Sequence, residues 1–255
     1  MSEVATAAAH KRRLRLVQWG LALGLALALE FVCRMGWVLP TTVVPPSTMV
    51  LALIQAAADP EARIDFAVTL GSVALASAIA ALLGIGVGIG LHAAPRLRRA
   101  AEPFIASYYA LPLFALYPML VVVFGVGTKP IIVTGVIYAM MSVVIGTLSG
   151  LDRIPRVFRK AAKAHRLGPV ATLRRVLVPS CAPEIVGGIT LSVSYAFVTV
   201  IASEFLLAPR GIGHAIAYAF TSFRTARMYG LMLGLALCIV AVNMAMRRVR
   251  QMVGP

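Results

Sequence analysis

The amino-acid sequence predicts an all-α, polytopic membrane protein with six transmembrane helices. Two observations on composition support this class: 60% of the 255 residues are hydrophobic, and 13% are charged, about half of the ~25% that is typical of soluble domains. The third is a series of almost charge-free runs, each long enough to cross a hydrocarbon core of ~30 Å at ~1.5 Å per residue. We expect helices, because the runs are continuously apolar and lipid offers no partner to unpaired backbone groups.

Six apolar runs give the expected spans. In chain order they are Leu16–Cys33, Phe66–Ala94, Phe104–Gly125, Pro130–Leu151, Ile185–Ala208 and Met228–Met246. The basic segment Lys11–Arg15 before the first run is also typical of a signal peptide, but no small-residue cleavage site follows it and five further apolar runs do. We therefore expect residues 1–255 to form a single transmembrane domain that retains its first helix.

The positions of the basic residues predict the orientation. Six spans place both termini on one side of the membrane. Of the 24 lysines and arginines, that side holds four in residues 1–15, three in 95–103, eight in 152–184 and three in 247–255, which leaves six for the other side. The positive-inside rule then predicts that both termini are cytoplasmic. It also accounts for most of the net charge of +15 without nucleic acid as a partner.

Two segments on the outer side are too polar to span the membrane and too apolar to be free loops. Between the first two spans, Pro45-Pro46 stops one helix, Ser47 or Thr48 can cap a new one, and Asp59-Pro60 ends it. We expect a short amphipathic helix there. After the fifth span, residues 209–228 are expected to pack back into an outer vestibule.

Small and polar residues within the spans predict helix contacts. Glycines four residues apart let helix backbones approach closely in lipid, and the pairs are Gly20/Gly24, Gly84/Gly88, Gly86/Gly90 and Gly230/Gly234. Glu30 and Arg34 are expected to form a local ion pair, and Asn243 a helix contact. The three cysteines are isolated along the chain, so neither a disulfide framework nor a metal site is expected.

The longest cytoplasmic loop, residues 152–184, has an ordered spacing of alanine, glycine and proline. Arg156–Leu167 predicts a helix, Gly168-Pro169 a break, and Ala171–Leu177 a second helix that Pro179 stops. The result would be a helix–turn–helix that projects from the membrane. A solvated basic loop that only obeys the positive-inside rule would explain the charges but not this spacing.

Here the sequence resembles the permease subunits of binding-protein-dependent ATP-binding-cassette (ABC) importers. Their cytoplasmic signature is Glu-Ala-Ala, three residues, Gly, and a proline at the twentieth position. With Lys160 as the first position, Ala161-Ala162 match the alanines and Val176–Pro179 the closing run, whereas Lys160 and Arg166 replace the signature Glu and Gly. Elements of the nitrate, sulfonate and taurine branch have counterparts in Tyr108–Pro112, Phe124–Gly127 and Gly211–Ile216. The resemblance covers about residues 40 to 246.

The resemblance implies a type I ABC importer permease fold in a bacterial inner membrane. The loop would be a coupling helix that docks on a separate ATPase, with these residues at or near the contact: Lys160, Ala161, Ala162, Lys163, His165, Arg166, Leu167, Gly168 and Pro179. It also implies a homodimer of permeases, two ATP-binding subunits that hold ATP and Mg, and an extracytoplasmic solute-binding protein. The chain itself would hold no cofactor and catalyse no reaction.

Candidate residues for a translocation pathway lie in the third and fifth expected spans. Pro112 and Pro118 each free a backbone carbonyl and bend a helix, and Tyr109 and Tyr117 offer hydroxyl groups; tyrosines of an interfacial belt are the alternative. In the fifth span the candidates are Tyr195, Thr199 and Glu204. An acid within a span is a functional hypothesis by default, but Glu204 could instead be neutral or paired with Arg210.

On the outer side, Arg210 and His214, helped by Arg224 and Arg227, could attract an anionic solute. Two other functions stay open at this point. A channel or secondary carrier would not need the projecting loop. An intramembrane enzyme would need a nucleophile with a base, for which only Ser192 or Ser194 with His214 is on offer.

Overall fold

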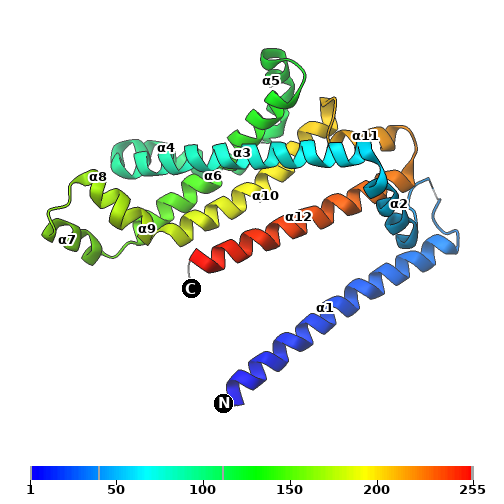
Figure 1. The fold of residues 1–255 in the computed structure, drawn as a ribbon, viewed down its shortest axis with the longest axis horizontal. Helices are drawn as coiled ribbons and strands as arrows, with labels where there is room; N and C mark the ends of the chain where they lie inside the picture. The colour runs from blue at the N-terminus through cyan, green and yellow to red at the C-terminus, as the bar shows by residue number, and fades with distance from the viewer. Residues whose placement is uncertain (1, 40, 111, 254–255) are drawn as a thin grey trace.

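The structure is a computed structural model that describes residues 2–39, 41–110 and 112–253, and all the regular secondary structure in these ranges is helical. Within these ranges, four helices are long and apolar enough to cross a membrane. They are α3 (Pro60–Ala93), α6 (Thr128–Arg153), α10 (Ala182–Leu207) and α12 (Thr225–Val253). They run roughly along one axis (Figure 1), and they contain the second, fourth, fifth and sixth expected spans except for Ala94 and Ala208.

Helix α6 packs against both α3 and α10, and α10 contacts all three of the other long helices. Glycines make both contacts close: a Cβ on Gly84 would stand 2.7 Å from the Cβ of Val143, and a Cβ on Gly146 would stand 3.0 Å from the Cα of Gly188. The expected contacts at Gly84/Gly88 and Gly230/Gly234 are therefore confirmed. The other two pairs, Gly20/Gly24 and Gly86/Gly90, meet nothing within 4 Å in this chain, so that prediction is wrong for the chain alone.

The first expected span lies within α1 (Ser2–Arg34). This helix stands apart from the bundle in Figure 1 and approaches it only near its C-terminal end, at α2 (Pro46–Ala58). Its apolar side chains, such as Leu21 and Leu25, are exposed in the isolated chain. Lipid or a second protein must therefore cover them.

The third expected span is wrong as a single helix. Residues 104–125 are divided among the end of α4 (Pro95–Ser107), two 3₁₀ turns (Tyr108–Ala110 and Leu113–Leu116) and α5 (Tyr117–Phe124). Proline causes this division, because Pro112 cannot donate a helical hydrogen bond and Pro118 is tolerated only in the first turn of a helix, where it begins α5. In Figure 1, α5 leans out of the bundle. Leu111, within the Tyr108–Pro112 resemblance, lies outside the described residues, as do Met1, Gly254 and Pro255 of the two tails.

Short helices cover the two ends of the bundle. At one end, which we call the α11 end, lie α2 and α11 (Ile212–Thr221), as expected for segments that do not span. At the other, the α7 end, the segment 154–181 forms a hairpin. It contains α7 (Arg156–Ala164), α8 (Pro169–Thr172), a π-helical turn (Leu173–Leu177) and α9 (Val178–Ser180). Both chain termini point toward the α7 end in Figure 1.

Candidate functional site

The α7 hairpin, residues 154–181, projects beyond the long helices (Figure 1). Helix α7 ends in a Schellman motif: the Leu167 N–H donates to the Ala162 carbonyl over 3.0 Å, and the Arg166 N–H donates to the Lys163 carbonyl over 2.9 Å. This motif needs a left-handed residue, and Arg166 has a φ of 51°. The residue that stands at the signature glycine therefore keeps the backbone conformation that glycine adopts without strain.

Most of the expected contact residues are exposed on this hairpin. Lys160, Ala161, Lys163, His165, Arg166 and Gly168 are open to solvent, and Leu167 is half-buried. Ala162, in contrast, is buried and packs within the hairpin, so it supports the surface rather than forming it.

Pro179 does not stop the second helix, contrary to expectation. The chain stays helical from Pro169 through Ser180, but residues 173–177 widen into a π turn in which the Val178 N–H donates to the Leu173 carbonyl. A proline ring clashes with the carbonyl four residues earlier and leaves it without a donor. A π turn is a recognised way for a helix to accommodate a local break in its hydrogen-bond ladder, here the one at Pro179.

The base of the hairpin is fixed to the bundle by charge and by packing. Arg98 of α4 binds both oxygens of Asp152 in α6, at 2.8 and 2.6 Å, which is the strong bidentate form of this pair. Gly150 of α6 allows the two ends of the hairpin to approach each other, since a Cβ there would stand 2.7 Å from the Cβ of Cys181, which precedes α10. Burial raises the pKa of the Cys181 thiol, consistent with a packing role. The base of the hairpin is therefore in contact with α4, α6 and α10.

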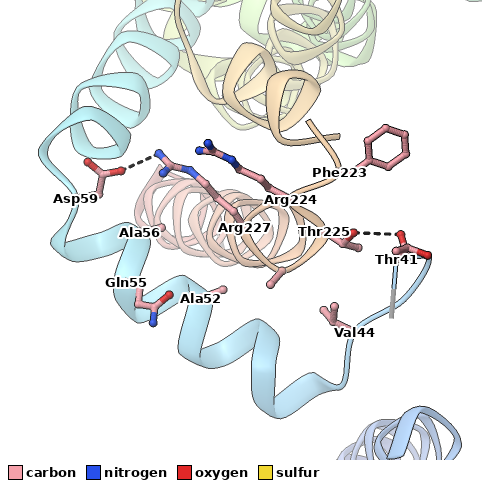
Figure 2. Close-up of a pocket in the computed structure, with 11 residues that line it drawn as sticks. Thr41, Val44, Ala52, Gln55, Ala56, Asp59, Phe223, Arg224, Thr225 and Arg227 are labelled. Atoms are coloured by element: carbon pink, nitrogen blue, oxygen red, sulfur yellow. Dashed lines mark hydrogen bonds and ion pairs between the residues drawn. The ribbon is translucent and has the colours of Figure 1, made fainter. Parts of the chain in front are cut away.

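At the α11 end, the expected cationic residues line one cavity. Arg210, His214, Arg224 and Arg227 surround a space of about 430 Å³ together with Glu61 and Asp65. A second cavity of about 610 Å³ shares Arg224 and Arg227. Figure 2 shows these two arginines side by side, with Arg227 bound to Asp59 over 2.7 Å. Among the described residues, Arg210 and Arg224 take part in no ion pair.

Glu204 lies inside the protein, with 1% of its surface exposed, and binds the N-terminus of α11. One carboxylate oxygen accepts from the Gly213 N–H over 3.0 Å, and both accept from the Thr69 hydroxyl of α3 at 2.8 and 3.0 Å. Thr69 in turn accepts from the Ile212 N–H, and Asp65 accepts from the Gly211 N–H. The partners of Glu204 are thus the Gly213 N–H and the Thr69 hydroxyl rather than Arg210, an arrangement that the sequence analysis missed.

The tyrosine candidates separate into two environments. Tyr109 stacks on Tyr195 with ring centroids 4.6 Å apart, and Tyr138 of α6 meets both edge-on. Tyr117 is fully buried, and the buried Thr199 hydroxyl donates to the carbonyl of Tyr195. The structure thus brings Tyr109 and Tyr195 together, with a third ring that the sequence analysis did not select. Pro112 and Pro118 are exposed on the broken segment beside them.

The residues that an enzyme would need are not close partners. The Ser194 hydroxyl donates to the Asn243 side chain of α12 over 3.0 Å, which confirms the expected helix contact of Asn243. His214 instead stacks against Tyr218 at the α11 end. The described residues also hold no group of three or more potential metal ligands.

Comparisons with known proteins agree with this arrangement. The sequence model of the family "Binding-protein-dependent transport system inner membrane component" matches residues 80–255. The taurine transport system permease protein TauC of Escherichia coli (strain K12) is 28% identical over 225 residues, 82% of each chain. The nitrate import permease protein NrtB of Synechococcus elongatus is 28% identical over 155 residues, 61% of this chain and 56% of that one.

Two further relatives are more distant. The glycine betaine/proline betaine transport system permease protein ProW of Salmonella typhimurium is 26% identical over 149 residues, 58% of this chain and 42% of that one. A chain in an inward-facing crystal structure of the MetNI methionine ABC transporter has the same fold, with a TM-score of 0.65 at 19% identity over 74% of this chain and 94% of that chain. The chain therefore belongs to the family of inner-membrane permease components of binding-protein-dependent ABC transporters, a multi-pass subunit that is not itself a catalyst and whose ATP is bound by a partner ATPase.

Proposed function

We propose that this permease moves a small anionic solute inward by alternating access, driven by an ATPase that holds the α7 hairpin. The observation that carries the proposal is the projecting hairpin with its rigid base at Arg98 and Asp152. A lever must reach a partner and transmit its movement, and the projection of the hairpin and the bidentate pair at its base support this role. A channel or secondary carrier has no use for such a lever, so that alternative is less well supported.

The α7 end is then the cytoplasmic end, because the ATPase works in the cytoplasm. The proposal puts the four basic segments, residues 1–15, 95–103, 152–184 and 247–255, on this side, as the positive-inside rule predicts. The complete transporter would contain two copies of this chain, two ATP-binding subunits and an extracytoplasmic solute-binding protein. The exposed apolar surface of α1 and α5 is available for lipid or for the second copy.

The solute class is argued from the cavity at the α11 end. Arg210 and Arg224 take part in no ion pair among the described residues, and with His214 they face the same space. Taurine and nitrate, in the names of two relatives, both present a compact, anionic oxygen-rich group. We therefore propose a sulfonate or a small oxyanion as the solute, attracted to the cavity by its positive field.

The route beyond this cavity is proposed to pass the ring cluster of Tyr109, Tyr138 and Tyr195, beside the segment broken at Pro112 and Pro118. Tyr117 and Thr199 are buried, and we assign them a supporting role, since the Thr199 hydroxyl donates to the Tyr195 carbonyl. Glu204 leaves the proposed route, because its oxygens are already used to hold α11.

The coupling role is tested by exchanging residues 156–179 for an unrelated basic linker of equal length. We expect that the ATPase no longer co-purifies with the permease and that ATP-driven uptake stops. Arg96→Gln with Arg99→Gln is the matched control, since both side chains are exposed on α4 at the same end; these changes should leave assembly and uptake intact. Preserved assembly and uptake after the exchange would refute the role.

The solute class is tested by uptake of taurine and of nitrate into cells or proteoliposomes that contain the whole transporter. Arg210→Glu with Arg224→Glu should slow uptake and reduce its dependence on salt. Arg63→Glu is the control, because this exposed residue of α3 lies at the same end outside the cavity. An equal loss in the control, or no loss in the double variant, would contradict an anionic solute.

A further inference from the structure

A groove of about 850 Å³ at the α7 end lies between α6, α10 and α12 and serves none of the roles above. Its floor is low because Gly146, Gly187 and Gly188 carry no side chains. Arg250 leans over this floor: its guanidinium atoms are 3.8 to 3.9 Å from the position that a Cβ on Gly187 would take. The groove is therefore a formed depression with a cation inside it.

The charges of the groove lie at its end nearest the α7 hairpin and are mostly positive. Arg153, Arg247 and Arg250 line this end together with one acid, Glu184. The carboxylate oxygen Oε1 of Glu184 lies 3.9 Å from Nη1 of Arg153. Neither Arg247 nor Arg250 is in an ion pair with any described residue. Two guanidinium groups, three residues apart on one face of α12, are thus available to an anion.

The other end of the groove is mostly apolar, and the polar side chains that also line it, Ser142, Ser194 and Asn243, make hydrogen bonds within the protein. Ile145, Leu191, Val240 and Met244 line it, and all four are exposed in the chain. Val240 is seven residues from Arg247, which is about 10 Å along a helix. Serine and threonine hydroxyls lie between these ends, at Ser149 and Thr190. The polarity therefore changes from cationic through hydroxyl-rich to mostly apolar over the distance between a lipid headgroup and its first acyl carbons.

We propose that this groove binds an anionic phospholipid, with the headgroup phosphate at Arg247 and Arg250 and one acyl chain along Ile145, Leu191, Val240 and Met244. A free anion would satisfy the arginines but would leave the apolar end bare. A neutral lipid would cover the apolar end but would leave the two cations without a partner. Basic pockets between spanning helices near the cytoplasmic surface are the recognised form of such sites. The inference does not depend on which solute the transporter carries.

The test compares phosphatidylglycerol with phosphatidylcholine of the same acyl chains, added to the purified transporter complex and counted by native mass spectrometry. Because each basic residue near an anionic surface contributes roughly fivefold in affinity, phosphatidylglycerol should bind roughly 25-fold more tightly. Arg247→Gln with Arg250→Gln should abolish this preference without weakening phosphatidylcholine binding. Arg248→Gln is the matched control, since Arg248 is the next residue of α12 but does not line the groove.

A second variant keeps all the charges. Gly187→Leu places a side chain in the groove, where the atoms nearest to the new Cβ would belong to Arg250 at an ordinary contact distance of 3.8 to 3.9 Å; it should weaken binding of both lipids. Inorganic phosphate and glycerol phosphate should displace phosphatidylglycerol poorly. Equal binding of the two lipids to the native complex, an equal loss in Arg248→Gln, full binding in Gly187→Leu, or ready displacement by phosphate would each overturn the proposal. The last result would indicate a site for a soluble anion instead.

Discussion

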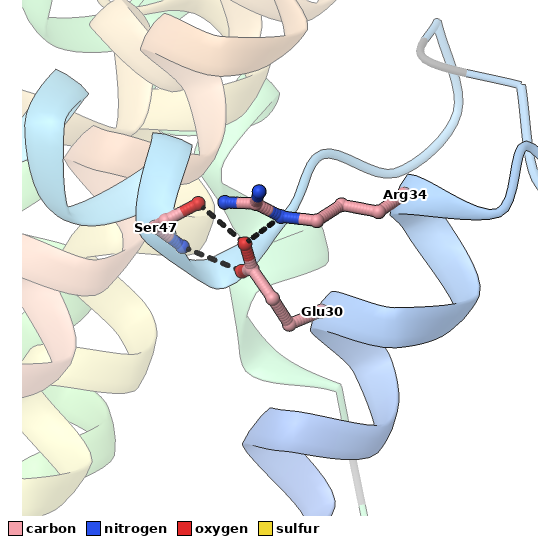
Figure 3. Close-up of polar contacts among 3 residues, drawn as sticks. All are labelled: Glu30, Arg34 and Ser47. Atoms are coloured by element: carbon pink, nitrogen blue, oxygen red, sulfur yellow. Dashed lines mark hydrogen bonds and ion pairs between the residues drawn. The ribbon is translucent and has the colours of Figure 1, made fainter.

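Helices α2 and α11 lie at the same end of the bundle, and the N-terminus of each is bound by a glutamate from a long helix. For α2, Glu30 of α1 accepts from the Ser47 N–H over 3.0 Å and from its hydroxyl over 2.7 Å, beside Arg34 (Figure 3). For α11, Glu204 accepts from the Gly213 N–H and from Thr69. The two contacts use the same chemistry, a carboxylate at the positive end of a helix.

The surroundings of the two contacts differ. Glu30, Arg34 and Ser47 lie at the surface of the chain, where solvent and salt compete for every partner. Glu204 is buried, and Asp65 and Thr69 bind the two adjoining N–H groups. A buried donor that loses its acceptor pays the full cost of desolvation. We therefore expect the α11 contact to fix a helix in place and the α2 contact to guide a helix that can still move.

The largest effect is expected from Glu204→Ala. This change leaves the Gly213 N–H and the Thr69 hydroxyl without their acceptor and opens a cavity, so it should destabilise the protein by about 3 kcal/mol. Thermal unfolding of the purified complex measures this effect, and limited proteolysis reports on α11 directly. Glu204→Gln retains one acceptor oxygen and is expected to lose less. A loss in Glu204→Ala no larger than that of an exposed substitution would show that α11 is held by apolar packing alone.

The next effect concerns the space under α11. A Cβ on Gly213 would stand 2.6 Å from the Ile201 carbonyl oxygen and 2.7 Å from the Cβ of Glu204. Gly213→Ala must therefore push α11 away from α10, at about 2 kcal/mol. Gly86→Ala is the control, because Gly86 of α3 meets nothing within 4 Å and alanine is preferred to glycine within a helix. The unfolding temperature should fall in Gly213→Ala and rise in Gly86→Ala. A change in the same direction in both variants would contradict the close approach of α11 to α10.

The buried contact at α11 could not be foreseen from the sequence, because Glu204 and Thr69 are 135 residues apart and Ile212 is 143 residues from Thr69. Nothing local distinguishes an acid that caps a distant helix from one that binds a solute. The glycines Gly211 and Gly213 were a signal of close backbone approach, but they do not identify what approaches. The exposed pair of Glu30 and Arg34, four residues apart, was predictable because its geometry is local.

A similar division applies to the fold. Helices α3, α6, α10 and α12 follow from length and apolar composition alone, since nothing within those runs competes with a helix. The segment 104–125 is equally apolar, yet Pro112 and Pro118 divide it, and composition does not report where a chain breaks. The hairpin at 154–181 was predictable from the spacing of its breakers. Helix α7, however, ends at Ala164 rather than at Leu167. This end depends on the left-handed conformation of Arg166, which arginine rarely adopts.

The C-terminal ends of α2 and α11 also differ, and this difference predicts a smaller effect on stability. Helix α2 ends at Ala58, and the following residue, Asp59, has an extended backbone and caps α3 by accepting from the Glu61 N–H. Helix α11 ends in a Schellman motif whose left-handed residue is Phe223, at a φ of 54° and 82% exposed. Phe223→Gly should remove this strain and stabilise the protein by about 1 kcal/mol. Phe223→Ala keeps the strained conformation and should give no gain, so equal gains would exclude backbone strain as the cause.

The smallest effect on stability is expected from Glu30→Gln. Because the contacts of Glu30 are exposed, the unfolding temperature of the bundle should stay within error of the native value. The position of α1 should change instead, since the hydrogen bonds of Glu30 to Ser47 join α1 to the N-terminus of α2. Spin labels on Leu21 of α1 and on Val50 of α2, both exposed positions, report this as a broader distribution of distances.

Salt provides an independent form of the same test. Raising the ionic strength should broaden the distances in the native chain toward those of Glu30→Gln, because screening weakens exposed charge pairs. It should leave α11 in place, since the buried contact at Glu204 is screened far less. If salt or Glu30→Gln lowered the unfolding temperature as much as Glu204→Ala does, the two contacts would be energetically alike and burial would not be the property that separates them.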